Sequence, residues 1–142
     1  MIFQEETNTI DNFLHDIFLM SNCPCGLSQP YQHCCGRYIE TAAHAPSAET
    51  LMRTRYTAYS QANIDYIAKT MRGKPRQGFS KKQAFEWAST ANWLKLEVVD
   101  ATETTVDFKA YYEFEGQPKV LHEKSLFKLH KGQWFYVGEA QS

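Results

Sequence analysis

The chain has 142 residues, an apolar fraction of 43% and a formal net charge of −1. This length fits one domain with a short appendage, and the near-neutral charge makes nucleic acid or anionic lipid an unexpected partner. No segment approaches the roughly 18 consecutive apolar residues of a membrane span, and residues 1–20 lack the basic start of a secretory signal. We therefore expect a cytoplasmic protein that does not contact a membrane.

The first twenty residues carry a helical apolar stripe. Apolar side chains recur there at spacings of three and four, at Ile10, Phe13, Leu14, Ile17 and Phe18. This spacing predicts an amphipathic helix within residues 1–20. Its acidic polar face disfavours a membrane surface, so we expect the helix to dock on its own domain or on a second copy of the chain.

Three further helices are expected between residues 47 and 91. Ser47 is typical of an N-cap, and the residues behind it repeat at helical spacing. A shorter helix over 64–71 ends before Gly73, and Ser80 with Gln83 forms a capping-box pattern that opens the third helix. The side chains expected to face inward from this third helix are Ala84, Phe85, Ala88 and Ala91.

The apolar period then changes from 3.6 to 2, which is typical of strands. Alternation predicts a strand over 93–98, in which Leu94, Leu96 and Val98 share a face, and another over 106–114. A turn at 115–118 precedes a strand over 119–130, and a second turn leads into a last strand over 133–138. This order predicts an α+β fold whose helices pack on one face of a curved four-stranded antiparallel sheet.

All four cysteines of the chain lie within thirteen positions, at Cys23, Cys25, Cys34 and Cys35. Disulfides within either close pair would be strained, and a bridge between the pairs would be reduced in the cytosol. Four thiolates on two tight turns match tetrahedral zinc and leave no position for water. We therefore predict a closed structural zinc site. Free thiols and a redox pair are the alternatives, and His33 is the one spare ligand nearby.

Three other residues of this segment carry specific expectations. Gly26 is expected to bring its backbone N–H close to a thiolate, and Gly36 to permit the turn that leaves the site. Tyr31 is expected to pack over the loop, because so short a segment has no core of its own.

The run Cys23-Pro-Cys25-Gly26, Tyr31 and Cys34-Cys35-Gly36 carries a first resemblance. It resembles the SEC-C motif, named from the C-terminal tail of the translocation ATPase SecA, where this zinc knuckle contacts the chaperone SecB and the ribosome. The resemblance implies bound zinc and an interaction with a protein partner. At residues 27–30 this chain has Leu-Ser-Gln-Pro, where the family has Ser-Gly-Lys-Lys.

A second resemblance runs across nearly the whole chain. The matching residues are Leu51-Met52-Arg53-x-Arg55-Tyr56-x-Ala58-Tyr59, Asp65-Tyr66, Lys69-Thr70, Trp93-Leu94-x-Leu96, Glu123-x-Ser125-x-Phe127 and Gly132-Gln133-Trp134-x-Tyr136. They resemble the YchJ family, which places a SEC-C knuckle ahead of a nuclear-transport-factor-two-like (cystatin-like) domain. The resemblance implies a cone in which helices cover a curved sheet and often leave a cavity. We expect a helix within 1–20, the knuckle over 21–40 and the α+β domain over 47–142.

One face of the third expected strand mixes polar and apolar side chains. Its members are Leu121, Glu123, Ser125, Phe127 and Leu129. The apolar members indicate that this face points inward, and a buried carboxylate is costly unless it is paired, with Arg53 and Arg55 as the expected partners. Two interpretations stay open: an Arg55–Glu123 pair that fixes the helix on the sheet, or a polar patch in a ligand cavity.

The residues that we single out as pocket candidates are Arg55, Tyr56, Tyr59, Trp93, Tyr112, Glu123 and Ser125. Catalysis by Glu123 as a general base is disfavoured, because no histidine is expected beside it: His122 points to the opposite face of the strand, and His130 lies at a turn. The sequence thus leaves two functional hypotheses. The first is a non-enzymatic zinc-binding adaptor that contacts another protein through its knuckle and its acidic N-terminal end. The second is a small-ligand-binding or enzymatic cone domain.

The sequence also allows a homodimer. Related folds often dimerise through the sheet, and the strand face that carries Lys109, Tyr111 and Glu113 allows this arrangement.

Overall fold

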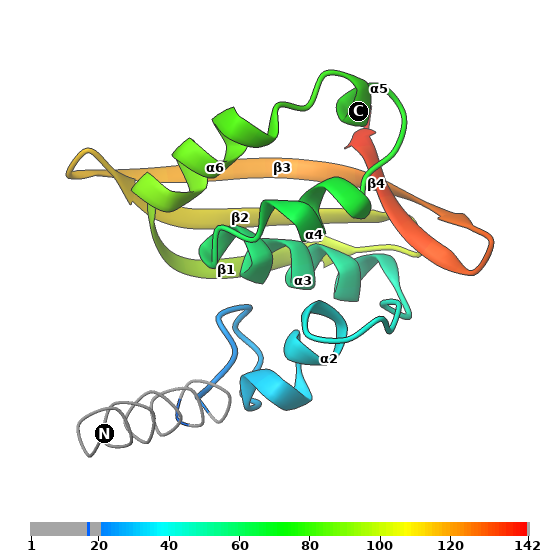
Figure 1. Cartoon of the computed structure of the whole chain (residues 1–142), viewed down its shortest axis with the longest axis horizontal. Coiled ribbons are helices and arrows are strands. Elements are labelled where there is room, and N and C mark those ends of the chain that lie inside the picture. The colour runs from blue at the N-terminus through cyan, green and yellow to red at the C-terminus, as the bar shows by residue number, and fades with distance from the viewer. Residues whose placement is uncertain (1–16, 18–20, 142) are drawn as a thin grey trace, which may run out of the picture.

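The computed structural model describes Ile17 and residues 21–141. Except for Ile17, the amphipathic helix expected within residues 1–20 lies outside the described residues. The described part forms an α+β fold in which helices precede one antiparallel sheet of strand order β1-β2-β3-β4 (Figure 1). None of its helices is long and apolar enough to cross a membrane.

The elements follow one another in a simple order along the chain. They are the 3-10 helix η1 (Tyr31–His33), α2 (Gly36–Ile39), α3 (Ala48–Ser60), α4 (Ile64–Lys69), α5 (Lys74–Gln77), α6 (Lys81–Thr90), β1 (Asn92–Ala101), β2 (Thr105–Phe114), β3 (Gln117–His130) and β4 (Gln133–Glu139). The expected α+β fold class is confirmed. The three expected helices are α3, α4 and α6, to which the structure adds the short helices α2 and α5.

Polar side chains cap the start of all three of these helices. The Ser47 hydroxyl accepts the backbone N–H of Thr50 at the start of α3 (3.1 Å). The Ser80 hydroxyl accepts that of Gln83 at the start of α6 (3.2 Å). These bonds satisfy backbone donors that a helix leaves free at its N-terminus, as the sequence predicts. A side-chain cap that was not predicted, Asn63, opens α4 in the same way.

The inward face of α6 differs from the prediction at one large residue. Ala88 is buried, but the Phe85 side chain is 53% exposed, and the half-buried Trp87 takes the inward position instead. Residues 84, 87, 88 and 91 share one helical face by their spacing, whereas position 85 lies outside it. Helical spacing therefore places Trp87 on the inward face of α6, and the prediction that Phe85 faces inward was wrong.

Two-residue turns join the last three strands. Glu115 and Gly116 have φ angles of 53° and 76°, and Lys131 and Gly132 have φ angles of 50° and 79°. Two consecutive positive φ angles define the turn that matches the twist of antiparallel strands. Both predicted turns are confirmed, the first being tighter than the expected 115–118.

A bulge near the start of β1 breaks the predicted alternation. Trp93 pairs with Tyr112, and the register then shifts, so that Lys95 pairs with Tyr111. As a result Trp93 is half-buried, Leu96 is buried and Leu94 is 53% exposed. Strict alternation predicts that Leu94 and Leu96 share a face of the sheet. This prediction fails because the bulge inserts an extra residue in β1, so that residues before and after it no longer alternate in step.

Helix α3 lies at the centre of the fold. In Figure 1 the segment 21–40 (blue to cyan) lies on the side of α3 away from α6. Most of α3 is buried, and two of its threonines, Thr54 and Thr57, are fully buried toward the cysteine segment. The opposite side of the helix, which includes Tyr56 and Tyr59, faces α6 and the sheet. One helix therefore supports the cysteine cluster on one side and lines a cavity on the other.

Candidate functional site

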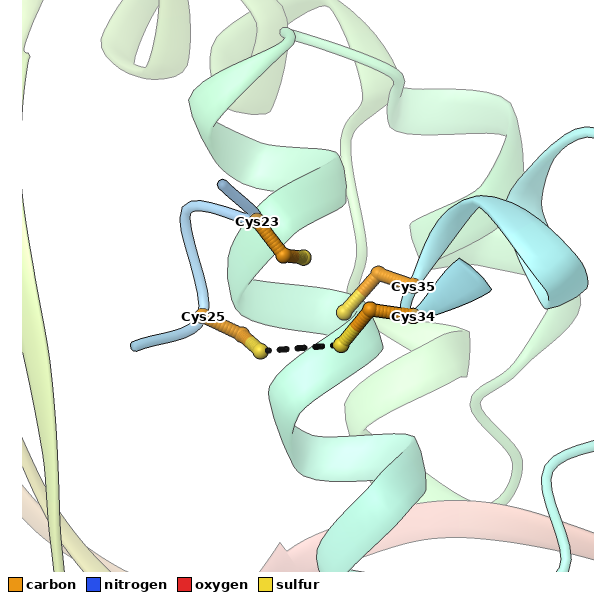
Figure 2. Close-up of side chains that lie close together, drawn as sticks. All are labelled: Cys23, Cys25, Cys34 and Cys35. Carbon is orange, nitrogen blue, oxygen red and sulfur yellow. Dashed lines mark hydrogen bonds between the residues drawn. The ribbon is translucent and has the colours of Figure 1, made fainter. Parts of the chain in front are cut away.

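The four cysteines form one compact cluster. Cys23 and Cys25 come from the loop before η1, and Cys34 and Cys35 come from the junction of η1 and α2. Figure 2 shows the four side chains pointing toward one another. All four sulfur atoms lie within 4.8 Å of one another, and the Sγ atoms of Cys25 and Cys34 are 3.5 Å apart. None of the four forms a disulfide.

This geometry fits a bound metal ion. Four sulfurs at tetrahedral positions, each about 2.3 Å from a central ion, are separated by about 3.8 Å. The observed separations bracket that value, and three of the four cysteines are buried while Cys34 is half-buried. Because all four ligands are thiols, the cluster can hold a soft divalent cation with no position left open for water.

The pKa shifts of the thiols also favour a bound cation in the cluster. Hydrogen bonds from the thiols of Cys25 and Cys35 lower the pKa of Cys23, so one thiolate is stabilised. Burial, followed by the neighbouring Cys25, raises the pKa of Cys34 to about 12. Further ionisation therefore requires a positive charge among the sulfurs, which a bound metal ion supplies.

Two residues of α3 hold the cluster against the domain. The Thr57 hydroxyl donates a hydrogen bond to Cys35 Sγ (3.3 Å) and lies 3.8 Å from Cys23 Sγ. Arg53 donates from Nη1 to the backbone carbonyl of Cys25 (2.9 Å). Hydrogen bonds to the sulfurs and to the ligand backbone orient metal ligands, so α3 acts as the outer support of this site.

The position of Arg53 corrects a prediction. Arg53 was expected to pair with Glu123, but its Nε instead forms an ion pair with Glu49 one turn earlier on α3 (3.0 Å). Arg53 and Thr57 are four residues apart and therefore lie on the same face of the helix. The four-residue spacing can be read from the sequence, but the sequence does not show that the cysteine segment covers the face of α3 that carries Arg53 and Thr57.

The glycines and the tyrosine of the knuckle have partly different roles from those expected. The N–H of Gly26 is directed to the Cys23 carbonyl (3.3 Å) rather than to a sulfur, and its φ of +94° is the reason for glycine. At Gly36 a Cβ atom would lie 2.7 Å from the Tyr31 carbonyl and 2.9 Å from its ring. Tyr31 is 1% exposed and donates its hydroxyl to Glu40, so it packs over the loop. His33 is exposed and is not part of the cluster.

A cavity of about 500 Å³ lies on the other side of α3, against α6 and the sheet. Six of the seven pocket candidates line it: Arg55, Tyr56, Tyr59, Trp93, Glu123 and Ser125. The seventh, Tyr112, is not part of the wall, which corrects its assignment. Its ring stacks behind the wall, 5.4 Å from the Trp93 ring and 5.7 Å from the Trp87 ring.

The direct Arg55–Glu123 pair considered from the sequence is not formed. Among the described residues, ion pairs join Arg53 to Glu49 and Lys81 to Asp65, and the His122 ring contacts the Asp107 carboxylate.

Arg55 instead donates from Nη1 to the Ile67 carbonyl and to the Thr70 hydroxyl, both at 2.8 Å. The Glu123 carboxylate accepts the hydroxyls of Ser125 and, at 3.4 Å, Tyr136. Tyr136 lies between the two charges, since the guanidinium carbon is 4.8 Å from the centre of its ring.

Trp87 and Tyr136 are cavity residues that sequence reasoning missed. Trp87 contacts the rings of Tyr59 (5.8 Å) and Trp93 (5.0 Å). Tyr136 is fixed by backbone pairing, since its N–H donates to the Thr70 carbonyl (2.9 Å) and its carbonyl accepts from Arg72 (3.0 Å). Helical spacing could have found Trp87, because it lies on the same face of α6 as Ala84 and Ala88. No local pattern predicts the pairing of β4 with the segment after α4.

Burial changes the acidity of the groups around the cavity. It raises the pKa of Glu123, against the opposing effect of its hydrogen bond from Ser125. Burial also raises the pKa of Tyr56 to about 12. Among the described residues no histidine lines the cavity, and His122 instead contacts Asp107 on the exposed side of the sheet (2.7 Å). The cavity wall thus has polar groups that can hydrogen-bond a ligand.

Together, the curved sheet under helices and the cysteine cluster ahead of it define an NTF2-like domain that carries a SEC-C type cysteine knuckle. A family model described as "YchJ, middle NTF2-like domain" matches residues 47–139. The chain therefore belongs to the YchJ family, as its sequence indicated.

Similar proteins agree with this assignment. The chain is 35% identical over 123 residues to a UPF0225 protein of Haemophilus influenzae (strain 86-028NP), covering 83% of this chain and 76% of that one. It is 36% identical to a UPF0225 protein of Geobacter sulfurreducens, with 81% and 76% covered.

Two solved structures are also similar. One is the solution structure of a SEC-C motif containing protein from Rhodopseudomonas palustris, with 33% identity and a TM-score of 0.76 over 86% of this chain and all of that one. The other is the crystal structure of a SEC-C motif containing protein from Psychrobacter arcticus, with 29% identity and a TM-score of 0.70 over 89% and 86% of the two chains.

Proposed function

We propose that this protein is a non-enzymatic binding protein in which a structural zinc ion supports a domain that takes up a small organic molecule. The observation that carries the proposal is the cavity of about 500 Å³, whose wall combines aromatic rings with Arg55, Glu123 and Ser125. Cavities of this size, mostly apolar with a few convergent polar groups, are typical of small-molecule sites.

Zinc is the metal that best suits the cysteine cluster. Four thiolates at tetrahedral spacing are a structural zinc set, and a closed set leaves the ion no catalytic position. The SEC-C resemblance of the two similar structures supports the same choice. We further propose a cytoplasmic location, because a reducing compartment keeps cysteines out of disulfides and available to bind zinc; the four cysteines form no disulfide in the structure.

Contacts with α3 support a structural role for the proposed zinc site. Thr57 and Arg53 contact the cluster from α3, while the opposite face of the same helix supplies Arg55, Tyr56 and Tyr59 to the cavity. A fixed knuckle therefore fixes the helix that carries much of the cavity wall.

Native mass spectrometry of the full chain tests the binding function. The wild type, purified without denaturation, is expected to carry a small organic molecule that is released on unfolding. Ala84 lines the cavity from α6, so Ala84→Trp fills the space and is expected to remove the molecule. Ser89→Trp, at an exposed position of the same helix, is the matched control and should retain it.

Both variants should bind metal as the wild type does, which separates a filled cavity from a lost fold. The proposal fails if the wild type carries no molecule and binds nothing in a fragment screen by nuclear magnetic resonance. It fails equally if Ala84→Trp carries as much of the molecule as Ser89→Trp does.

A second candidate function, a protein adaptor, is supported by the exposed tip of the knuckle. Leu27 is 41% exposed there, and the neighbouring Ser28 and Gln29 are exposed as well. In this function Leu27→Glu would remove a co-purifying partner, whereas Leu129→Glu, at an exposed position of β3, would not. Quantitative mass spectrometry of proteins that co-purify from cells provides the comparison, and identical partner sets for the two variants would exclude the adaptor.

A further inference from the structure

Arg55 is a buried charge in the wall of the cavity. Its side chain extends from α3 and the residue is only 7% exposed, yet it contributes to the cavity lining. A charged group taken out of water is costly unless it is paired and hydrogen-bonded. The partners of this guanidinium therefore show what the cavity is built to receive.

Protein acceptors satisfy only one end of the guanidinium. Nη1 carries two N–H groups, and these have two acceptors, the Ile67 carbonyl and the Thr70 hydroxyl. Tyr136 covers a face of the group, which uses none of its N–H donors. The edge formed by Nε and Nη2, with three further N–H groups, has no hydrogen-bond acceptor among residues 17 and 21–141.

Glu123 does not take this edge. Its carboxylate is directed to the hydroxyls of Ser125 and Tyr136, and no ion pair joins it to Arg55 in the described part of the chain. Burial raises the pKa of Glu123, so its carboxyl takes up a proton more readily than an exposed glutamate does. The cavity therefore presents an unpaired cation beside a weakened anion.

The wall also contains a group of aromatic rings. Trp87 and Trp93 meet edge to face with their ring centres 5.0 Å apart, and Tyr56 and Tyr59 contact Trp93 from α3. Rings in this arrangement offer flat apolar surfaces at which a planar ligand can pack.

We propose that the cavity binds a small aromatic carboxylate. Its carboxylate oxygens accept hydrogen bonds from Nε and Nη2 of Arg55, and its ring packs against Trp87 and Trp93. A carboxylate matches two parallel donors of one guanidinium edge and carries a single charge. A phosphate, with nearly two charges, would be repelled more strongly by Glu123. This inference rests on the proposed small-molecule function and adds the chemical class of the ligand.

Isothermal titration calorimetry with three matched probes tests the inference. They are 2-naphthoate, the neutral 2-naphthamide and the cationic 2-naphthylmethylammonium, which share one ring system. A hydrogen bond to a charged group changes affinity by about tenfold or more, so 2-naphthoate is expected to bind at least about tenfold more tightly than 2-naphthamide. The cation is expected to bind most weakly.

Two further readouts identify Arg55 as the group responsible. In the wild type, 2-naphthoate should shift the Arg55 Nε–H resonance in a ¹⁵N spectrum, which requires no variant and so does not depend on whether a variant folds. Arg55→Lys keeps the charge but loses the paired donors, and should reduce 2-naphthoate affinity while leaving 2-naphthamide unchanged. Arg72→Lys, at an exposed arginine that stacks on Phe135, is the control and should change neither.

The outcomes separate this inference from the proposed function. Equal binding of the three probes, or an unshifted Arg55 resonance, overturns the carboxylate assignment and leaves a ligand-binding cavity. Failure of all three probes overturns it too, and a molecule found by native mass spectrometry would then still support the proposed function. Failure of both experiments overturns both.

Discussion

At the scale of single residues, Gly36 has no room for a side chain. A Cβ atom there would lie 2.7 Å from the backbone carbonyl of Tyr31, which cannot move without displacing the knuckle. Gly36→Ala is expected to reduce the free energy of unfolding by about 1–3 kcal/mol, the usual cost of overpacking. Urea denaturation measures this change.

The control for this substitution is Gly78→Ala. Gly78 has a φ of −92°, and the nearest atom to its Cβ position is 3.9 Å away. It should stay close to the wild-type stability, and an equal loss in both variants would contradict the assigned role of Gly36.

Glu123 is the residue whose charge should set a pH dependence of stability. Its neighbours are Arg55 and Tyr59 from α3, Ser125 on its own strand, and Tyr136 and Glu139 from β4. Burial raises its folded pKa, so the folded state holds this proton more tightly than the unfolded state does. This contribution to stability is complete below the unfolded pKa and is lost as the pH rises through the raised folded value.

Glu123→Gln removes the titration. The variant should gain stability over the wild type as the pH rises from about 4 to 8, since the unfolded pKa of glutamate is near 4.3. Thermal unfolding across this range gives the difference, with Glu103→Gln in an exposed loop as the control. A stability difference between Glu123→Gln and wild type that does not vary with pH would contradict the raised pKa of Glu123.

At the scale of elements, α3 joins the knuckle to the cavity. The hydrogen bond from Arg53 to the Cys25 carbonyl attaches the knuckle to this helix. Arg53→Met keeps the apolar stem and removes the bond, and changes to such outer contacts typically cost about 10- to 100-fold in metal affinity. We expect the variant to release metal to a chelator faster, while its NTF2-like domain stays folded.

Glu49→Gln is the matched control for Arg53→Met. It breaks the ion pair at Arg53 Nε but leaves the Nη1 bond to Cys25 intact. Metal release should therefore remain near the wild-type rate, and a control as fast as Arg53→Met would show that the ion pair, not the knuckle contact, is what matters.

Local patterns predicted most elements but not the way they combine. The caps at Ser47 and Ser80 and the glycine turns depend on short-range chemistry, so the sequence identifies them. The bulge at Trp93 depends on the pairing of β1 with β2, which periodicity alone does not contain.

The same distinction holds for the candidate site. Four cysteines in thirteen positions predict their own cluster, because the chain between them is short. Each of the charged residues considered for the pair also has a partner in another segment: Arg53 contacts the Cys25 carbonyl, Arg55 the Ile67 carbonyl and Glu123 the Tyr136 hydroxyl. Residue type alone therefore suggested a pair that the fold does not make. Tyr136, which separates Arg55 from Glu123, is placed by long-range pairing.

At the scale of the whole molecule, the cysteine cluster and the cavity lie on opposite sides of one helix. The central claim is that a zinc ion in the cluster holds this arrangement together. Metal content by inductively coupled plasma mass spectrometry, combined with thiol titration of the folded full-length chain, tests it most directly. We expect one zinc per chain and four thiols that react only after unfolding or chelation. A folded chain without zinc, whose four thiols react freely, would contradict it.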